Sequence, residues 1–169
     1  SLTPTSATIT WNTTSGAYEY VIDNLAANPT TAGTAITTNT YSPSSLTPNT
    51  VYYVHVRSNC NGSLSPWYTF MFTTPLVPPA NDNCSGAIVL TPGATFNTNP
   101  LTANLTGATN SNPPAPGCAD FLGGDVWYSV TVPASGSVTI ETNPAAASVI
   151  TDTGMAVYSG TCGSLTFVE

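Results

Sequence analysis

Apolar and polar residues alternate in short runs along this chain, and Gly, Pro, Asn, Ser and Thr interrupt the runs. The interruptions come about every eight to twelve residues, a spacing typical of short β-strands joined by turns. Apolar residues do not recur at the helical interval of about 3.6 positions. The pattern therefore predicts an all-β protein.

Two groups of strands are predicted. The first group covers residues 7–11, 18–23, 34–37, 51–59 and 67–73, and the second covers 87–90, 102–105, 126–132, 137–142, 154–158 and 165–168. Segment 75–80 between them holds three prolines and favours a short, stiff polyproline II linker. We therefore expect two tandem β-sandwich domains.

The run 46–57 gives the strongest strand signal. A Pro-Asn pair supplies a turn, and β-branched and aromatic residues follow it. Because successive side chains of a strand point to opposite faces, Tyr52, Val54 and Val56 are expected to face the core.

The same alternation turns Tyr53, His55 and Arg57 outward in a row. Glu19 and Asp23 face outward on the strand expected beside it, so either carboxylate is a candidate partner for Arg57. A solvated ion pair of this kind contributes about 0–1 kcal/mol. The row is also a candidate binding patch for a charged ligand.

Composition narrows the classes of function. Charged residues make up only 5% of the chain, against roughly 25% in an average soluble domain. Arg57 is the only Arg, Lys is absent, and the net charge is −7. With so little positive charge to neutralise phosphates, nucleic acid is excluded as a partner and anionic membrane surfaces are disfavoured. No apolar run reaches the length of about 18 residues that marks a membrane span, so no membrane insertion is expected.

Four cysteines stand at positions 60, 84, 118 and 162. Their wide spacing matches no Cys-x-x-Cys metal or redox motif, and a single His removes Cys/His zinc sites. Disulfides are therefore expected, which indicates an oxidising compartment outside the cytosol. The residues alone do not select among the possible pairings.

Residues 1–74 carry three features of one known family. Trp11 ends an early apolar strand, Tyr18-Glu-Tyr-Val-Ile22 alternates, and Leu46-x-Pro-x-Thr-x-Tyr52 forms a corner before the next strand. Together they resemble a fibronectin type III domain, in which the Trp lies between two sheets and the Tyr ties its loop to the following strand. The first strand of that family is short or missing here.

Residues 81–169 carry a second set of ordered segments, which are Asn81-Asp-Asn-Cys84, Asp125-Val-Trp127-Tyr, Ser135-Gly-Ser-Val-Thr-Ile140 and Asp152-Thr-Gly-Met-Ala-Val-Tyr158. They resemble the jelly-roll sandwich domains related to bacterial pre-peptidase C-terminal domains, which recur in large secreted proteins of Bacteroidota. The resemblance implies export through the type IX secretion route and an extracellular or cell-surface location. Relatives usually continue further, so we expect the last strands of this module to lie beyond residue 169.

Given this resemblance, Cys84 and Cys118, which flank loops before core strands, are the favoured disulfide pair. Cys162 then requires a partner beyond residue 169, and Cys60 requires a partner elsewhere. The rival pairing joins Cys60 to Cys84 across the linker. A closed loop of this size contributes about 3–4 kcal/mol in the chain-entropy model.

Calcium is the one candidate cofactor that the sequence indicates. Calcium takes hard oxygen ligands, which Asp side chains in loops provide. Some of the related domains bind calcium near their N-terminal entry segment, which implicates Asn81 and Asp82 first, with Asp125 and Asp152 as further ligands. The alternative is that these carboxylates cap turns.

Catalytic residues are scarce. The only His lies within a strand, no Gly-x-Ser-x-Gly or phosphate loop occurs, and nothing positions two acids across a cleft. We therefore expect a non-catalytic adhesin or fibre segment whose partners are neighbouring domains and a surface glycan or protein. The alternative is a carbohydrate- or substrate-binding accessory module of a secreted hydrolase. The candidate aromatics for sugar stacking are Trp67, Tyr68, Trp127 and Tyr128.

Overall fold

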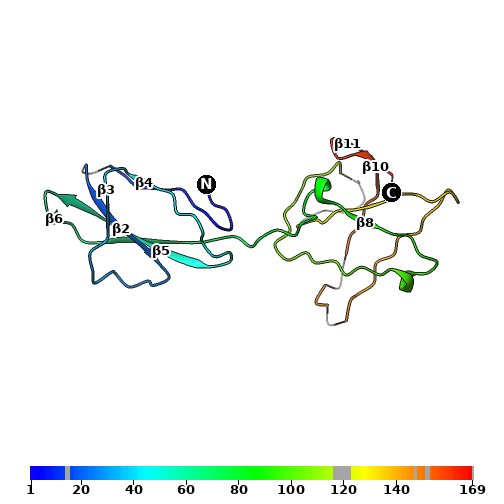
Figure 1. Ribbon diagram of the computed structural model, residues 1–169, viewed down its shortest axis with the longest axis horizontal. Helices are drawn as coiled ribbons and strands as arrows, with labels where there is room; N and C mark the ends of the chain where they lie inside the picture. Colours follow the sequence, from blue (N-terminus) through cyan, green and yellow to red (C-terminus); the bar gives the residue numbers. More distant parts are fainter. Residues whose placement is uncertain (14–15, 116–122, 147, 151–152, 169) are drawn as a thin grey trace. The chain divides into compact units, whose positions relative to one another are not determined.

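The computed structural model describes residues 1–13, 16–115, 123–146, 148–150 and 153–168 (Figure 1). The chain divides into two compact units, Ser1–Val77 and Pro78–Glu169, so the boundary falls inside the Pro-rich segment 75–80. The described residues form strands and two single-turn 3₁₀ helices, with no α-helix, and the fold class is all-β as predicted. No helix among them has the length and apolar character needed to cross a membrane.

The first unit is built around one antiparallel sheet. Its strands are β1 (Ile9–Thr10), β2 (Tyr18–Asp23), β3 (Thr34–Ile36), β4 (Thr40–Tyr41), β5 (Val51–Cys60), β6 (Ser63–Leu64) and β7 (Tyr68–Thr73). In the main sheet β3 pairs with β2, and β2 lies beside β5 (Figure 1). β7 pairs with the other edge of β5. β1 and β4 pair separately, while β6 forms a hairpin with the end of β5.

The core of the first unit lies against the inner face of β5. Val54 is 0% exposed and Val56 is 6% exposed, which confirms the inward alternation predicted for this strand. Trp11 packs against this cluster and meets Tyr18 edge to face, with ring centroids 5.6 Å apart. The remaining members of the buried cluster are Ala7, Ile9, Tyr18 and Leu46.

The corner before β5 is tied down as the sequence predicts. The backbone N–H of Thr47 donates to the Tyr52 hydroxyl oxygen at 2.9 Å. The buried hydroxyl of Thr74 donates to the Thr47 carbonyl at 2.6 Å and accepts from the Thr50 N–H at 2.9 Å. These bonds satisfy the backbone of the turn and fix where β5 begins.

The prediction of an exposed row on the outer face of β5 is wrong for His55. This residue is on the predicted face but is 0% exposed, because the segment after β2 folds back over it. Its Nε2 lies 3.1 Å from the Leu25 carbonyl oxygen and its Nδ1 lies 2.7 Å from Thr69 Oγ1. Asn28 Oδ1 accepts from the same Thr69 hydroxyl. Alternation assigns a side chain to a face, and a loop then decided whether that face met solvent.

The second unit holds less regular structure. Its elements are η1 (Cys84–Gly86), β8 (Ile88–Leu90), η2 (Phe96–Thr98), β9 (Tyr128–Val130), β10 (Tyr158–Thr161) and β11 (Ser164–Phe167). β8 and β9 pair in parallel, and β10 and β11 form an antiparallel hairpin. The strands predicted at 102–105 and 137–142 do not form, and β10 begins where the predicted strand 154–158 ends.

Truncation of a buried β5 side chain tests the inner face. We expect Val54→Ala to lower the free energy of unfolding by about 2 kcal/mol, since it removes buried methyl groups and leaves a cavity. Val51→Ala on the same strand is the matched control, because Val51 is 40% exposed. Urea denaturation measures both variants, and equal losses would contradict the inner-face assignment.

Candidate functional site

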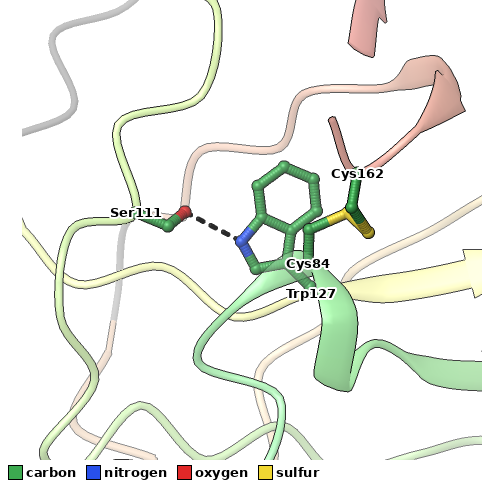
Figure 2. Close-up of a disulfide and its surroundings, with 4 residues drawn as sticks. All are labelled: Cys84, Ser111, Trp127 and Cys162. Atoms are coloured by element: carbon green, nitrogen blue, oxygen red, sulfur yellow. Dashed lines mark hydrogen bonds between the residues drawn. A yellow bond between two sulfur atoms is a disulfide. The ribbon is translucent and has the colours of Figure 1, made fainter. Parts of the chain in front are cut away.

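A disulfide between Cys84 and Cys162 joins the two ends of the second unit (Figure 2). Cys84 opens η1, and Cys162 follows β10 in the turn before β11. The two Cα atoms are 5.5 Å apart across a sequence separation of 78 residues, a distance within the usual range for a disulfide. The bond therefore holds the entry segment of the unit against its terminal hairpin.

This bond corrects the predicted cysteine pairing. Cys84 is bonded to Cys162, so neither Cys118 nor Cys60 is its partner, and Cys162 needs no partner beyond residue 169. The physical reason is tertiary, because the folding of the unit brings η1 beside the β10–β11 turn. Cys118 lies outside the described residues. Cys60 is an exposed free thiol at the end of β5.

Trp127 stands beside this disulfide (Figure 2). Its indole Nε1–H donates to Ser111 Oγ at 2.9 Å, and its ring is tilted against Tyr158 with centroids 5.9 Å apart. Its backbone N–H donates to the Asn81 carbonyl at 2.8 Å, while Asn81 Nδ2 donates to the Trp127 carbonyl at 3.1 Å. Trp127 is therefore fixed by a hydrogen bond from its indole N–H, by the contact of its ring with Tyr158 and by its backbone hydrogen bonds.

Two carboxylates support the loop that contacts Trp127. Asp82, which is 5% exposed, accepts from both the backbone N–H and the hydroxyl of Thr109. Asp125 accepts in the same way from the N–H and the hydroxyl of Ser111, at 3.2 and 2.8 Å. Each carboxylate thus fixes one residue of segment 109–111 through two hydrogen bonds. The sequence reasoning missed Thr109 and Ser111, which carry no motif beyond their spacing of two.

These contacts bear on the calcium prediction. Asn81, Asp82 and Asp125 gather around Trp127 and segment 109–111, and Asp152 lies outside the described residues. In the part of the chain that the structure describes, no three His, Cys, Asp or Glu residues are grouped to hold a metal. The carboxylates instead cap backbone N–H groups, which is the alternative that the sequence left open. Calcium stays a prediction that titration calorimetry would test.

A groove of about 480 Å³ opens beside the disulfide. Trp127 lines one part of it, and the Pro-rich segment 112–114 lines another. None of the described residues along it is charged. The polar residues of the lining are Asn83, Ser85, Ser111, Asn112 and Ser164, and the other lining residues are Cys84, Pro113, Pro114, Trp127, Cys162, Gly163 and Leu165. A groove of this chemistry suits a neutral polar ligand with some apolar surface.

The other predicted binding patch, on the first unit, is an internal network. Arg57 donates from Nη2 and Nε to Glu19 Oε2 at 2.6 and 2.9 Å, which confirms the cross-strand ion pair. Trp67 covers the guanidinium at 4.1 Å from the ring centroid, so Arg57 and Trp67 are engaged with each other. Asp23 Oδ1 lies 3.4 Å from His55 Nε2. Tyr53 is half-buried on the same face.

The aromatic candidates for sugar stacking separate in the structure. Trp67 covers Arg57, while Tyr68 is 70% exposed at the start of β7. Trp127 and Tyr128 are both half-buried, and Trp127 alone lines the groove. Trp67 and Tyr68 belong to the first unit, and Trp127 and Tyr128 belong to the second.

Comparison with known families identifies the second unit. Residues 80–165 match a family described as galactose binding domain-like and associated with the type IX secretion system. The chain belongs to this family. The galactose-binding-like fold is a jelly roll, and the galactose-binding-like domain is a type of non-catalytic accessory module. No curated protein matches the chain.

Removal of the disulfide tests what holds the second unit together. We expect the free energy of unfolding of the double variant Cys84→Ser, Cys162→Ser to be about 4 kcal/mol lower. The reason is that the disulfide no longer reduces the entropy of the unfolded chain by closing a loop of this length. Cys60→Ser is the matched control and is expected to leave stability unchanged, since Cys60 is exposed and unbonded. Urea denaturation measures both, and peptide mapping that linked Cys84 to another cysteine would contradict the pairing.

The ion pair on β2 and β5 makes the first unit sensitive to acid. The Arg57 guanidinium that donates to Glu19 holds the pKa of this carboxyl below its ordinary value of 4.5, against a smaller opposing effect of burial. A lowered folded-state pKa stabilises the fold above pH 4.5, and this contribution is lost as the pH falls through the lowered value. In a plot of the urea midpoint of unfolding against pH, the unmodified chain is expected to lose stability on the acid side. Glu19→Gln should reduce this loss, whereas Glu141→Gln in the second unit should leave it unchanged. Parallel acid limbs for the Glu19 variant and the unmodified chain would refute the assignment.

Proposed function

We propose that the chain is a non-catalytic contact segment of a secreted or cell-surface protein, and that its second unit binds a neutral glycan in the groove beside Trp127. The groove carries the proposal, because residues with amide, hydroxyl and aromatic side chains line it and none of the described lining residues is charged. Sugars offer hydroxyl groups to amides and hydroxyls, and they offer apolar ring faces to aromatic side chains.

The support around the groove favours binding over a purely structural role. Trp127 is fixed by Ser111, and Ser111 is fixed by Asp125. The disulfide joins Cys84 and Cys162, which also line the groove. A site whose walls are held before the ligand arrives loses less conformational entropy on binding, which raises its affinity. Asn112 is exposed and lines the groove next to Ser111, and its Nδ2 donates to the Asn110 carbonyl at 3.4 Å, which leaves the amide oxygen to accept from a ligand.

The first unit serves in this proposal as a spacer of fibronectin type III type. Its support is the partly buried Trp11 against the core, the Tyr52 corner and the pairing of β5 with β2 and β7. The family association with type IX secretion supports an extracellular or cell-surface location for the whole segment.

An accessory module of a secreted hydrolase is the second candidate, and the galactose-binding-like type of the second unit favours it. Both functions use the same groove but different ligands. An adhesin is expected to recognise short glycans of a cell surface, and an accessory module is expected to recognise the repeating polysaccharide that its enzyme degrades.

Glycan binding gives the test. The chain is expected to bind neutral glycans on an array, and Asn112→Ala is expected to weaken the best of them by about tenfold in calorimetry, for the loss of one hydrogen bond to a ligand. Asn97→Ala is the matched control, because Asn97 is an exposed Asn on η2 away from the groove. An array without bound glycans, or equal effects of the two variants, would reject the proposal.

A further inference from the structure

Strand β7 lies at the edge of the main sheet of the first unit. β7 pairs with β5 and with no other described strand, so one side of its backbone has no ladder partner in the described residues. The strand reads Tyr-Thr-Phe-Met-Phe-Thr, with no charge, no Pro and no Gly. Natural sheets protect such edges with Lys, Pro or bulges, because an unprotected edge pairs with other strands.

The backbone groups at this edge can be assigned from the neighbouring hydrogen bonds. Thr74 N–H donates to the Thr50 carbonyl on the β5 side, while Asn59 N–H donates to the Ala17 carbonyl on the β2 side. Even-numbered residues of β5 therefore face β7, and their even-numbered partners in β7 face back. The backbone groups of Thr69, Met71 and Thr73 are left pointing away from the sheet.

The side chains near the edge are exposed to an unusual degree. Met71 is 65% exposed and Tyr68 is 70% exposed. Phe70 and Phe72 face the core side but are only partly buried, and they line a groove of about 270 Å³ next to β1. The edge thus offers backbone donors and acceptors together with apolar surface on both faces.

We propose that β7 is a self-association surface, on which a second copy of the chain adds its own β7 in antiparallel orientation about a twofold axis. Only one register pairs all three outward-facing residues: Met71 opposes Met71 of the second copy, and Thr69 opposes Thr73. This register provides about six backbone hydrogen bonds. It also keeps each side chain on its own face, with Phe70 beside Phe72 of the second copy in a close pair.

The sequence of β7 favours a second copy as the occupant, because residues 69–73 read Thr-Phe-Met-Phe-Thr symmetrically about Met71. The charges of the first unit do not oppose it. The unit contains only four ionisable acidic and basic side chains besides its tyrosines and Cys60: Glu19, Asp23, His55 and Arg57. Glu19 is paired with Arg57, and Asp23 lies beside His55. All four lie on β2 and β5, not on β7, so two copies meet at this edge without like charges opposing each other. Two linked copies would present two glycan grooves, although the pairing does not depend on glycan binding.

Association of the whole chain is the first test. Sedimentation or light scattering is expected to show a monomer–dimer equilibrium, and Met71→Lys is expected to weaken it about tenfold or more, since two lysines would oppose each other at the twofold axis. Leu25→Lys is the matched control, because Leu25 is also 65% exposed but lies in a loop. A chain that stays monomeric up to about 1 mM, or a dimer that Met71→Lys leaves unchanged, overturns the proposal.

Disulfide trapping tests the register itself. In a Cys60→Ser background, the Met71→Cys variant is expected to form a disulfide between residue 71 of one copy and residue 71 of the second copy. The two residues of a hydrogen-bonded antiparallel pair lie about 5.5 Å apart at Cα, which is within disulfide range. Thr69→Cys should crosslink with Thr73→Cys when the two variants are mixed, and neither should crosslink with itself. Peptide mapping locates each bond. Equal crosslinking of Leu25→Cys, or self-crosslinking of Thr69→Cys, would overturn the twofold register.

Discussion

The middle of strand β5 is buried on both faces, and the first unit depends on this constraint. Three consecutive residues, Val54, His55 and Val56, are at most 6% exposed, although neighbouring side chains point in opposite directions. The inner pair fills the hydrophobic core, and the middle residue lies under the segment after β2. A strand covered on both sides must satisfy its backbone within the sheet, and β2 and β7 supply those partners along its length.

The outer face of β5 carries polar and charged side chains, and these side chains bond to polar groups of the residues that cover them. His55, Thr69 and Asn28 form a chain of hydrogen bonds, and Arg57 lies between Glu19 and Trp67. Nearly all the charge of a weakly charged unit is used here to dock a loop, where burial makes an unpaired polar group costly. The groove of the second unit and the edge of β7, whose described residues carry no charge, are the surfaces for which we propose binding.

The second unit is held in a different way. Its ladders are short, so the disulfide and the contacts between side chains and backbone carry more of the architecture. Asp82 and Asp125 each hold one residue of the same loop, and that loop holds Trp127. The groove follows from these supports, because its walls are the elements that they fix. The family is associated with type IX secretion, and secreted proteins meet the oxidising conditions in which a disulfide persists.

The sequence by itself determined the elements whose signal is local. Alternation located β2, β5 and β7 almost to the residue, and the Pro-rich segment marked the boundary between the units. Alternation also named Glu19 and Asp23 as candidate partners of Arg57, between which the register of β2 and β5 selects Glu19. Only the tertiary structure decided the burial of His55, the partner of Cys84 and the meeting of Ser111 with Trp127. The physical reason is common to all three. A strand pattern depends on neighbours two residues apart, whereas these contacts join segments whose approach is set by loops, and the alternating pattern of residues does not encode where a loop will fold.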